Sequence, residues 1–72
     1  NPRVLMNTAW AILRWVEQDG NSGDLLGNAK RLLDDAAYLA PDHSRLAGLQ
    51  TMLRNIESAM AAQRLAALIK PT

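Results

Sequence analysis

Cysteine and phenylalanine are absent from this chain of 72 residues, and two tryptophans and one tyrosine are its only aromatic residues. Without cysteine the chain can form no disulfide bond and carry out no thiol chemistry. The absence of cysteine therefore gives no indication of the cellular compartment. Its uncharged runs are too short to span a bilayer and no targeting signal opens the chain, so we expect no membrane insertion. Eight basic residues against seven acidic ones leave a net charge of +1, too weak to favour nucleic acid as a partner.

About half of the residues, 49%, are apolar, and most of these are leucine and alanine. This composition favours packed helices over a β-sandwich. The length allows one small domain over residues 1–72, whose core would be marginal alone. The chain begins at Asn1-Pro2 without an initiator methionine, so we expect a piece of a larger protein.

The central helix is predicted at about residues 24–40. Its small and apolar residues recur at helical spacing, and Pro41 follows as a residue that cannot continue the helix. Asp24 or Ser22, at the end of a glycine-containing loop, is the expected N-cap. The residues of the apolar stripe are Ala29, Leu33, Ala36 and Leu39.

A first helix is predicted at about residues 3–18, with Asn1 as its N-cap and Pro2 at its first position. The residues expected on its core side are Leu5, Thr8, Ala9, Ile12 and Val16. Trp15 lies at the edge of that stripe and is the better core candidate of the two tryptophans. Trp10 lies on the polar side with Arg3, Asn7, Arg14 and Glu17.

A third helical segment is predicted at about residues 44–70, capped by Asp42 or Ser44. Its apolar stripe is Leu46, Leu49, Leu53, Ile56 and Met60. Beyond Met60 the large apolar residues point away from that stripe. Either the chain bends near residues 55–58 into a fourth helix, or one long helix carries a second apolar patch. We favour the single helix.

Two stretches resemble the helices of a bacterial tetratricopeptide-type repeat, in divergent form. Residues 1–13 are similar to the first helix of such a repeat, with Leu5, Thr8, Ala9 and Ile12 at its large, medium, small and large packing positions. Residues 29–41 are similar to the second helix with its terminal proline. The motif specifies the size of the side chain at each position. The resemblance depends on the two stretches occurring in the same order as in the repeat.

The resemblance implies an antiparallel helical hairpin whose first helix lines a concave, partner-binding groove. The residues that it assigns to partner binding are Arg3, Met6, Asn7, Trp10, Leu13 and Arg14. The spacing of residues 29–41 returns near the C-terminus at Ala59, Gln63, Ala66 and Ile69, followed by Pro71. This second copy of the motif lacks about the length of a turn, so its helices are expected to fuse into the long helix over residues 44–70. That departure favours a fragment or C-terminal part of a larger repeat protein, either as its capping element or as a dimer.

No arrangement of chemically active residues predicts an enzyme. His43 lies in a Pro-Asp-His-Ser turn, where adjacent residues cannot converge as a catalytic triad, so a cap or turn role is expected. Asp34 and Asp35 diverge on a helix, and no further acidic or histidine cluster completes a metal site. We therefore predict no catalytic residue, no metal and no cofactor.

Two functions remain, and both are non-catalytic. The first is a protein-protein interaction module that binds a peptide or protein segment on the first-helix face, anchored by Trp10. The alternative is a structural self-association or solenoid-capping element with no separate ligand. A homodimer would then form through the long C-terminal helix, with Leu65, Leu68 and Ile69 in the contact. In a competing interpretation, Trp10 packs on the third helix or on a repeat that lies outside this fragment. Likewise, the three aliphatic residues would instead cover a core that lies elsewhere than predicted.

Overall fold

The computed structural model describes residues 1–69, which form three α-helices and, over that range, no strand. The helices are α1 (Pro2–Asp19), α2 (Leu25–Leu39) and α3 (Leu46–Ile69). The predicted all-α hairpin with a long third helix is confirmed, and α3 is one continuous helix with no break near residues 55–58. The predicted helix end at residue 70 and the following Pro71 lie outside the described residues.

Local hydrogen bonds explain where the helices begin. Asn1 Oδ1 accepts from the Arg3 N–H at 3.0 Å, with proline at the first helical position, as predicted. Asp24 caps α2 by accepting from the Gly27 N–H at 3.2 Å. Before α3, Nδ1 of His43 accepts from the Arg45 N–H at 3.1 Å. His43 therefore has the predicted cap-and-turn role, whereas Asp42 and Ser44 had been expected to supply the cap.

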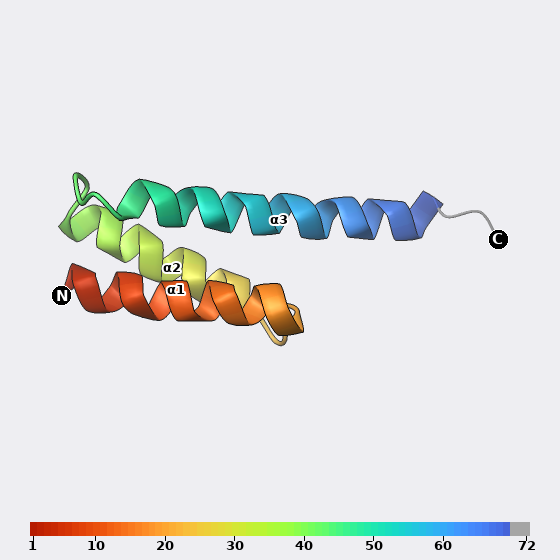
Figure 1. Ribbon diagram of the computed structural model, residues 1–72, viewed down its shortest axis with the longest axis horizontal. Coiled ribbons are helices and arrows are strands. Elements are labelled where there is room, and N and C mark those ends of the chain that lie inside the picture. The colour runs from red at the N-terminus through yellow and green to blue at the C-terminus, as the bar shows by residue number, and fades with distance from the viewer. Residues whose placement is uncertain (70–72) are drawn as a thin grey trace.

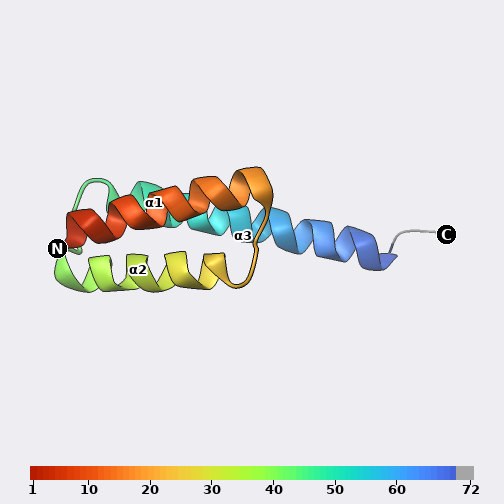
Figure 2. The same ribbon diagram turned by 90° about the horizontal axis from the view of Figure 1, so that it is seen from below.

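The three helices form two layers. The antiparallel helices α1 and α2 lie side by side in one layer, and α3 crosses one face of this hairpin (Figures 1 and 2). Figure 2 views the opposite face, with α1 and α2 in front of α3. The overall extents are 50 × 19 × 15 Å, and α3 continues well past the loop end of the hairpin.

The core lies where the three helices meet, and every side chain in it is apolar. Its members are Met6, Ala9, Leu13, Val16, Leu26, Ala29, Leu33, Ala36, Leu46, Leu49, Leu53 and Ile56. The small residues Ala9, Ala29 and Ala36 are fully buried, which lets the backbones of α1 and α2 approach closely. The stripes predicted for α2 and α3 are confirmed except at the last residue of each: Leu39 is 54% exposed and Met60 is only partly buried.

The predicted core side of α1 was wrong in part, because the buried side is rotated from it by less than one residue of helix. Met6 and Leu13 are fully buried, whereas Leu5 and Ile12 are only partly buried and Thr8 is exposed. Trp15, expected in the core, is 61% exposed. A rotation of one residue is about 100°, and Ala9 and Val16 belong to both stripes, so periodicity alone did not distinguish the two sides.

The last part of α3 extends beyond the hairpin. Residues 61–69, called the overhang below, are all exposed. Nine residues of helix extend for about 13 Å. The internal repetition of the 29–41 pattern near the C-terminus therefore does not produce a second buried stripe.

Candidate functional site

The structure divides the predicted partner-binding residues of α1 into two groups. Met6 and Leu13 are 0% exposed and belong to the core between the helices. Their assignment to a partner-binding surface is corrected, because a partner cannot reach a side chain that α2 and α3 already cover. The other four predicted residues stay exposed, namely Arg3, Asn7, Trp10 and Arg14.

Asn7 connects α1 to the beginning of α3. Its Oδ1 accepts a hydrogen bond of 2.6 Å from Nη1 of Arg45. Because the donor is a guanidinium, the bond is charge-assisted and stronger than one between neutral groups. Asn7 therefore helps to position α3 on the hairpin, a role that the sequence had not indicated.

Trp10 and Arg14 form the exposed centre of this side of α1. Trp10 is 46% exposed, and Cζ of Arg14 lies 6.0 Å from the centroid of its ring. That distance is the outer limit of a cation–π contact. Nη1 of Arg14 also lies 3.7 Å from Oε1 of Glu17, an exposed pair that contributes little to stability.

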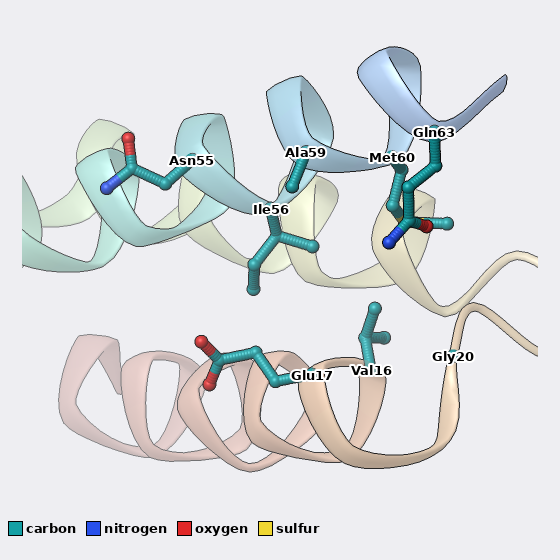
Figure 3. A pocket seen from close by; sticks show the side chains of 8 residues that line it. All are labelled: Val16, Glu17, Gly20, Asn55, Ile56, Ala59, Met60 and Gln63. Atoms are coloured by element: carbon teal, nitrogen blue, oxygen red, sulfur yellow. The ribbon is translucent and has the colours of Figure 1, made fainter. Parts of the chain in front are cut away.

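A groove opens between α1 and α3 near the loop end of the hairpin. Its cavity volume is about 460 Å³. Val16 and Ile56 point toward each other across it (Figure 3). The lining of this α1–α3 groove comprises Val16, Glu17, Gly20, Asn55, Ile56, Ala59, Met60 and Gln63.

The groove exists because the two helices differ in length. α1 ends at Asp19, and Gly20 follows with a φ of 87°, so the chain turns away while α3 continues. Gly20 lines one end of the groove, and Met60 and Gln63 line α3 beyond it. The apolar floor is therefore open at the end where α1 stops.

Trp10 does not line the groove itself but a separate hollow on the outer side of α1, which Trp15 also lines. Trp10 and Glu17 are seven residues apart, which places them on the same side of the helix, two turns from each other. Arg14 lies between them and contacts both. A strip of exposed side chains on α1 thus leads from Trp10 to the groove at Glu17.

The overhang carries the residues predicted for self-association. Leu65, Leu68 and Ile69 are 61%, 77% and 74% exposed. They cover no part of the core, which excludes the interpretation that they cover a core located elsewhere than predicted. Their role in a dimer remains a prediction.

Chemically active groups do not gather in the described part of the chain. Within residues 1–69, no group of three His, Cys, Asp or Glu side chains is arranged to hold a metal ion. His43 is occupied by its hydrogen bond to the backbone at Arg45. Over the same range, none of the helices combines the length and hydropathy of a membrane span.

Sequence reasoning missed the residues that line the groove. Val16, Ile56 and Met60 were expected only as core positions, and Asn55 and Gln63 were not assigned to a site. The signal that could have located the groove was the difference in predicted length between the helices at 3–18 and 44–70. When a long helix packs on a shorter helix, the apolar residues of the long helix stay uncovered beyond the point where the shorter helix ends.

Comparisons of this chain with protein-family models, with curated proteins and with solved structures find no match.

Proposed function

We propose that this chain is a non-catalytic protein-interaction module, which binds an extended protein segment in the α1–α3 groove with Trp10 as the anchor. The tetratricopeptide-like character of the chain is part of this proposal. The observation that carries it is the open groove between α1 and α3, which has Glu17 at its edge, two helical turns from the exposed Trp10 on the same side of α1.

The floor and the rim of the groove suit a peptide. The partly buried Met60 offers an apolar contact for a side chain of the bound segment, and Val16 and Ile56, only 4% and 8% exposed, close the groove beneath it. The carboxamides of Asn55 and Gln63 line the same groove. Each carboxamide supplies both donors and an acceptor, the groups needed to pair with a backbone N–H and C=O.

Trp10 is suited to fix the segment in place. Tryptophan and arginine dominate the binding energy of protein interfaces, because a large flat side chain loses much water for little conformational entropy. Arg14 lies against the Trp10 ring and reaches Glu17, so it can exchange that weak exposed pair for an acidic group of the partner. The expected ligand is a segment with apolar side chains and an acidic residue near its Trp10 end.

The test is selection from a displayed library of random peptides on the immobilised 72-residue chain, followed by affinity measurement on the enriched sequences. We expect enriched peptides to carry apolar residues, and Trp10→Ala to raise their Kd by about 30-fold, equivalent to about 2 kcal/mol at a binding hot spot. Met60→Glu, which puts a charge into the groove, is expected to abolish binding while the helical circular dichroism is unchanged.

The matched control is Trp15→Ala, which removes the same side-chain type from α1. Trp10 and Trp15 both line a hollow on the outer side of α1, but only Trp10 lies on the same side of the helix as Glu17, which lines the α1–α3 groove. Trp15→Ala should therefore bind the selected peptides nearly as well as the original chain. Failure of the library to yield any peptide above the bare support would contradict the proposal. Equal losses in Trp10→Ala and Trp15→Ala would contradict it as well.

A further inference from the structure

One straight strip of exposed residues runs along α1 beside α3. Its members recur at alternating intervals of four and three residues, a spacing that keeps side chains on one side of a helix. In chain order they are Arg3, Asn7, Trp10, Arg14 and Glu17, called the α1 strip below. The strip borders α3 at two points, because Asn7 bonds to Arg45 and Glu17 lines the α1–α3 groove.

Arg45 adds a third arginine to the α1 strip. It directly precedes α3, and its Nη1 donates to Oδ1 of Asn7 at 2.6 Å, which brings its guanidinium onto the strip. Arg3 lies one helical turn before Asn7 on the same side of α1. The guanidinium of Arg45 carries further N–H groups in a planar fork, so it can hold Asn7 and still bind a carboxylate. Two arginines therefore lie at one end of the strip, and Arg14 follows beyond Trp10.

The surroundings of these arginines contain no acidic residue. Residues 1–16 include no aspartate or glutamate, and neither do residues 43–56, which form the beginning of α3 and the end of the loop before it. Glu17, at the groove end, is the only acidic member of the α1 strip. The side of the molecule between α1 and the first half of α3 is therefore positively charged, although the net charge of the whole chain is only +1.

Two of the three arginines are also free of intramolecular ion pairs. Within residues 1–69, the one pair of opposite charges within 4.0 Å is that of Arg14 with Glu17. Arg3 and Arg45 have no carboxylate partner in that part of the chain, and Asp42, in the loop before α3, does not approach Arg45 so closely. Both side chains are exposed, so their charges are available to a ligand.

Distances along α1 set the spacing that a matching ligand needs. Trp10 follows Arg3 by seven residues, about 10 Å along the helix, and Arg14 follows Trp10 by four residues, about 6 Å. An extended segment advances about 3.3 Å per residue. A ligand residue opposite Trp10 is therefore about three positions from one opposite Arg3, and about two positions from one opposite Arg14.

We infer that the protein segment bound on the α1 strip is acidic, with two carboxylates about five residues apart and a large apolar residue between them. The inference rests on the proposed function and names the chemistry of its ligand. The first carboxylate pairs with Arg3 and Arg45, the apolar residue covers Trp10, and the second carboxylate replaces Glu17 as the partner of Arg14. Beyond that point the segment enters the α1–α3 groove with uncharged residues, because a carboxylate there would meet Glu17.

Single-stranded nucleic acid is the other ligand that arginine and tryptophan side chains bind together. Its phosphates recur at every nucleotide, so they would continue into the α1–α3 groove. That groove is lined by Glu17 and by no basic residue. An acidic peptide can confine its charges to one end, which matches the distribution of charge along the α1 strip.

The test compares two displayed peptide libraries of equal length on the immobilised 72-residue chain. One library fixes aspartate at two positions about five residues apart, the other fixes lysine at the same positions, and all other positions are random. We expect enrichment from the aspartate library alone. The affinity of the enriched peptides should fall about 10-fold when the salt concentration rises from about 0.05 M to about 0.5 M, because exposed ion pairs are screened.

Charge reversal on the α1 strip identifies the arginines involved. Arg3→Glu should weaken binding of an enriched peptide by about 10-fold, and a peptide with lysine in place of the first aspartate should bind this variant better than the original chain. Helix α1 should persist, because an acidic side chain in the first turn is favoured by the helix dipole. Arg31→Glu makes the same change of charge on the outer side of α2 and should leave the affinity within about twofold. Circular dichroism checks that both variants stay helical.

The outcomes separate this inference from the proposed function. Equal enrichment from both libraries, with binding that still requires Trp10, would overturn the inference and leave the proposed function in place. Enrichment from neither library would contradict both. Equal losses in Arg3→Glu and Arg31→Glu would overturn the inference, because net charge alone would then govern binding. Tighter binding of an oligothymidylate than of the enriched peptides would assign the surface to nucleic acid instead.

Discussion

Replacing Leu33 by alanine should remove a large share of the stability of this chain. Leu33 is 1% exposed and lies in α2 among the core residues. Truncating a fully buried leucine costs about 3 kcal/mol, from lost transfer free energy and the cavity that remains. A domain of 72 residues is stable by roughly 4–11 kcal/mol, so this single change removes between a quarter and most of the total.

The matched control is the same substitution at Leu65, which is 61% exposed on the overhang. Alanine is the better helix former and no cavity is created there, so Leu65→Ala should stay within about 0.5 kcal/mol of the original chain. Urea unfolding followed by circular dichroism at low micromolar concentration measures both variants. Leu33→Ala should also lower the midpoint of thermal unfolding by about 12 °C or more. The packing described here is refuted if Leu65→Ala costs as much as Leu33→Ala.

Three further predictions concern the helices. Gly48→Ala should stabilise the chain by about 0.5–1 kcal/mol in urea unfolding, because an added Cβ meets nothing within 4 Å and alanine favours a helix; a loss of stability would contradict this. Gly27→Ala should gain less than Gly48→Ala, because its Cβ would collide with the capping carboxylate of Asp24; an equal gain would show that the carboxylate moves freely. Amides of residues 61–69 should exchange with solvent faster than those of residues 46–60 in hydrogen-exchange NMR, because the overhang has no tertiary cover; uniform protection along α3 would contradict it.

Much of the fold could be predicted from local signals. Asn1-Pro2 begins α1, and Asp24 begins α2 with the predicted side-chain cap. The regular spacing of leucine and isoleucine from Leu46 to Ile56 predicted the buried side of α3. These features depend on neighbouring residues, whose spacing the sequence displays directly.

The side of α1 that faces the core could not be predicted in the same way. Apolar residues surround this helix, from Met6 and Leu13 on one side to Leu5, Ile12 and Trp15 on another. Which side is buried depends on where α3 lies, and that is a long-range property. The resemblance to a repeat placed Met6 and Leu13 in a binding groove, whereas the structure buries them.

The candidate site was also predictable only in part. Trp10, Arg3 and Arg14 are exposed as expected, because polar neighbours on a helix indicate its solvent side. The groove itself depends on α1 ending at Asp19 while α3 continues beside it. No residue type marks such a groove, since it is produced by the relative lengths of two helices.

The central claim is that Trp10, more than Trp15, anchors a protein segment bound in the α1–α3 groove. The most direct test is NMR of the two indole N–H signals, assigned with Trp15→Phe. A peptide selected on the chain should shift the Trp10 signal more than that of Trp15. A peptide that shifts the Trp15 signal as much as the Trp10 signal, or that shifts neither, would contradict the account.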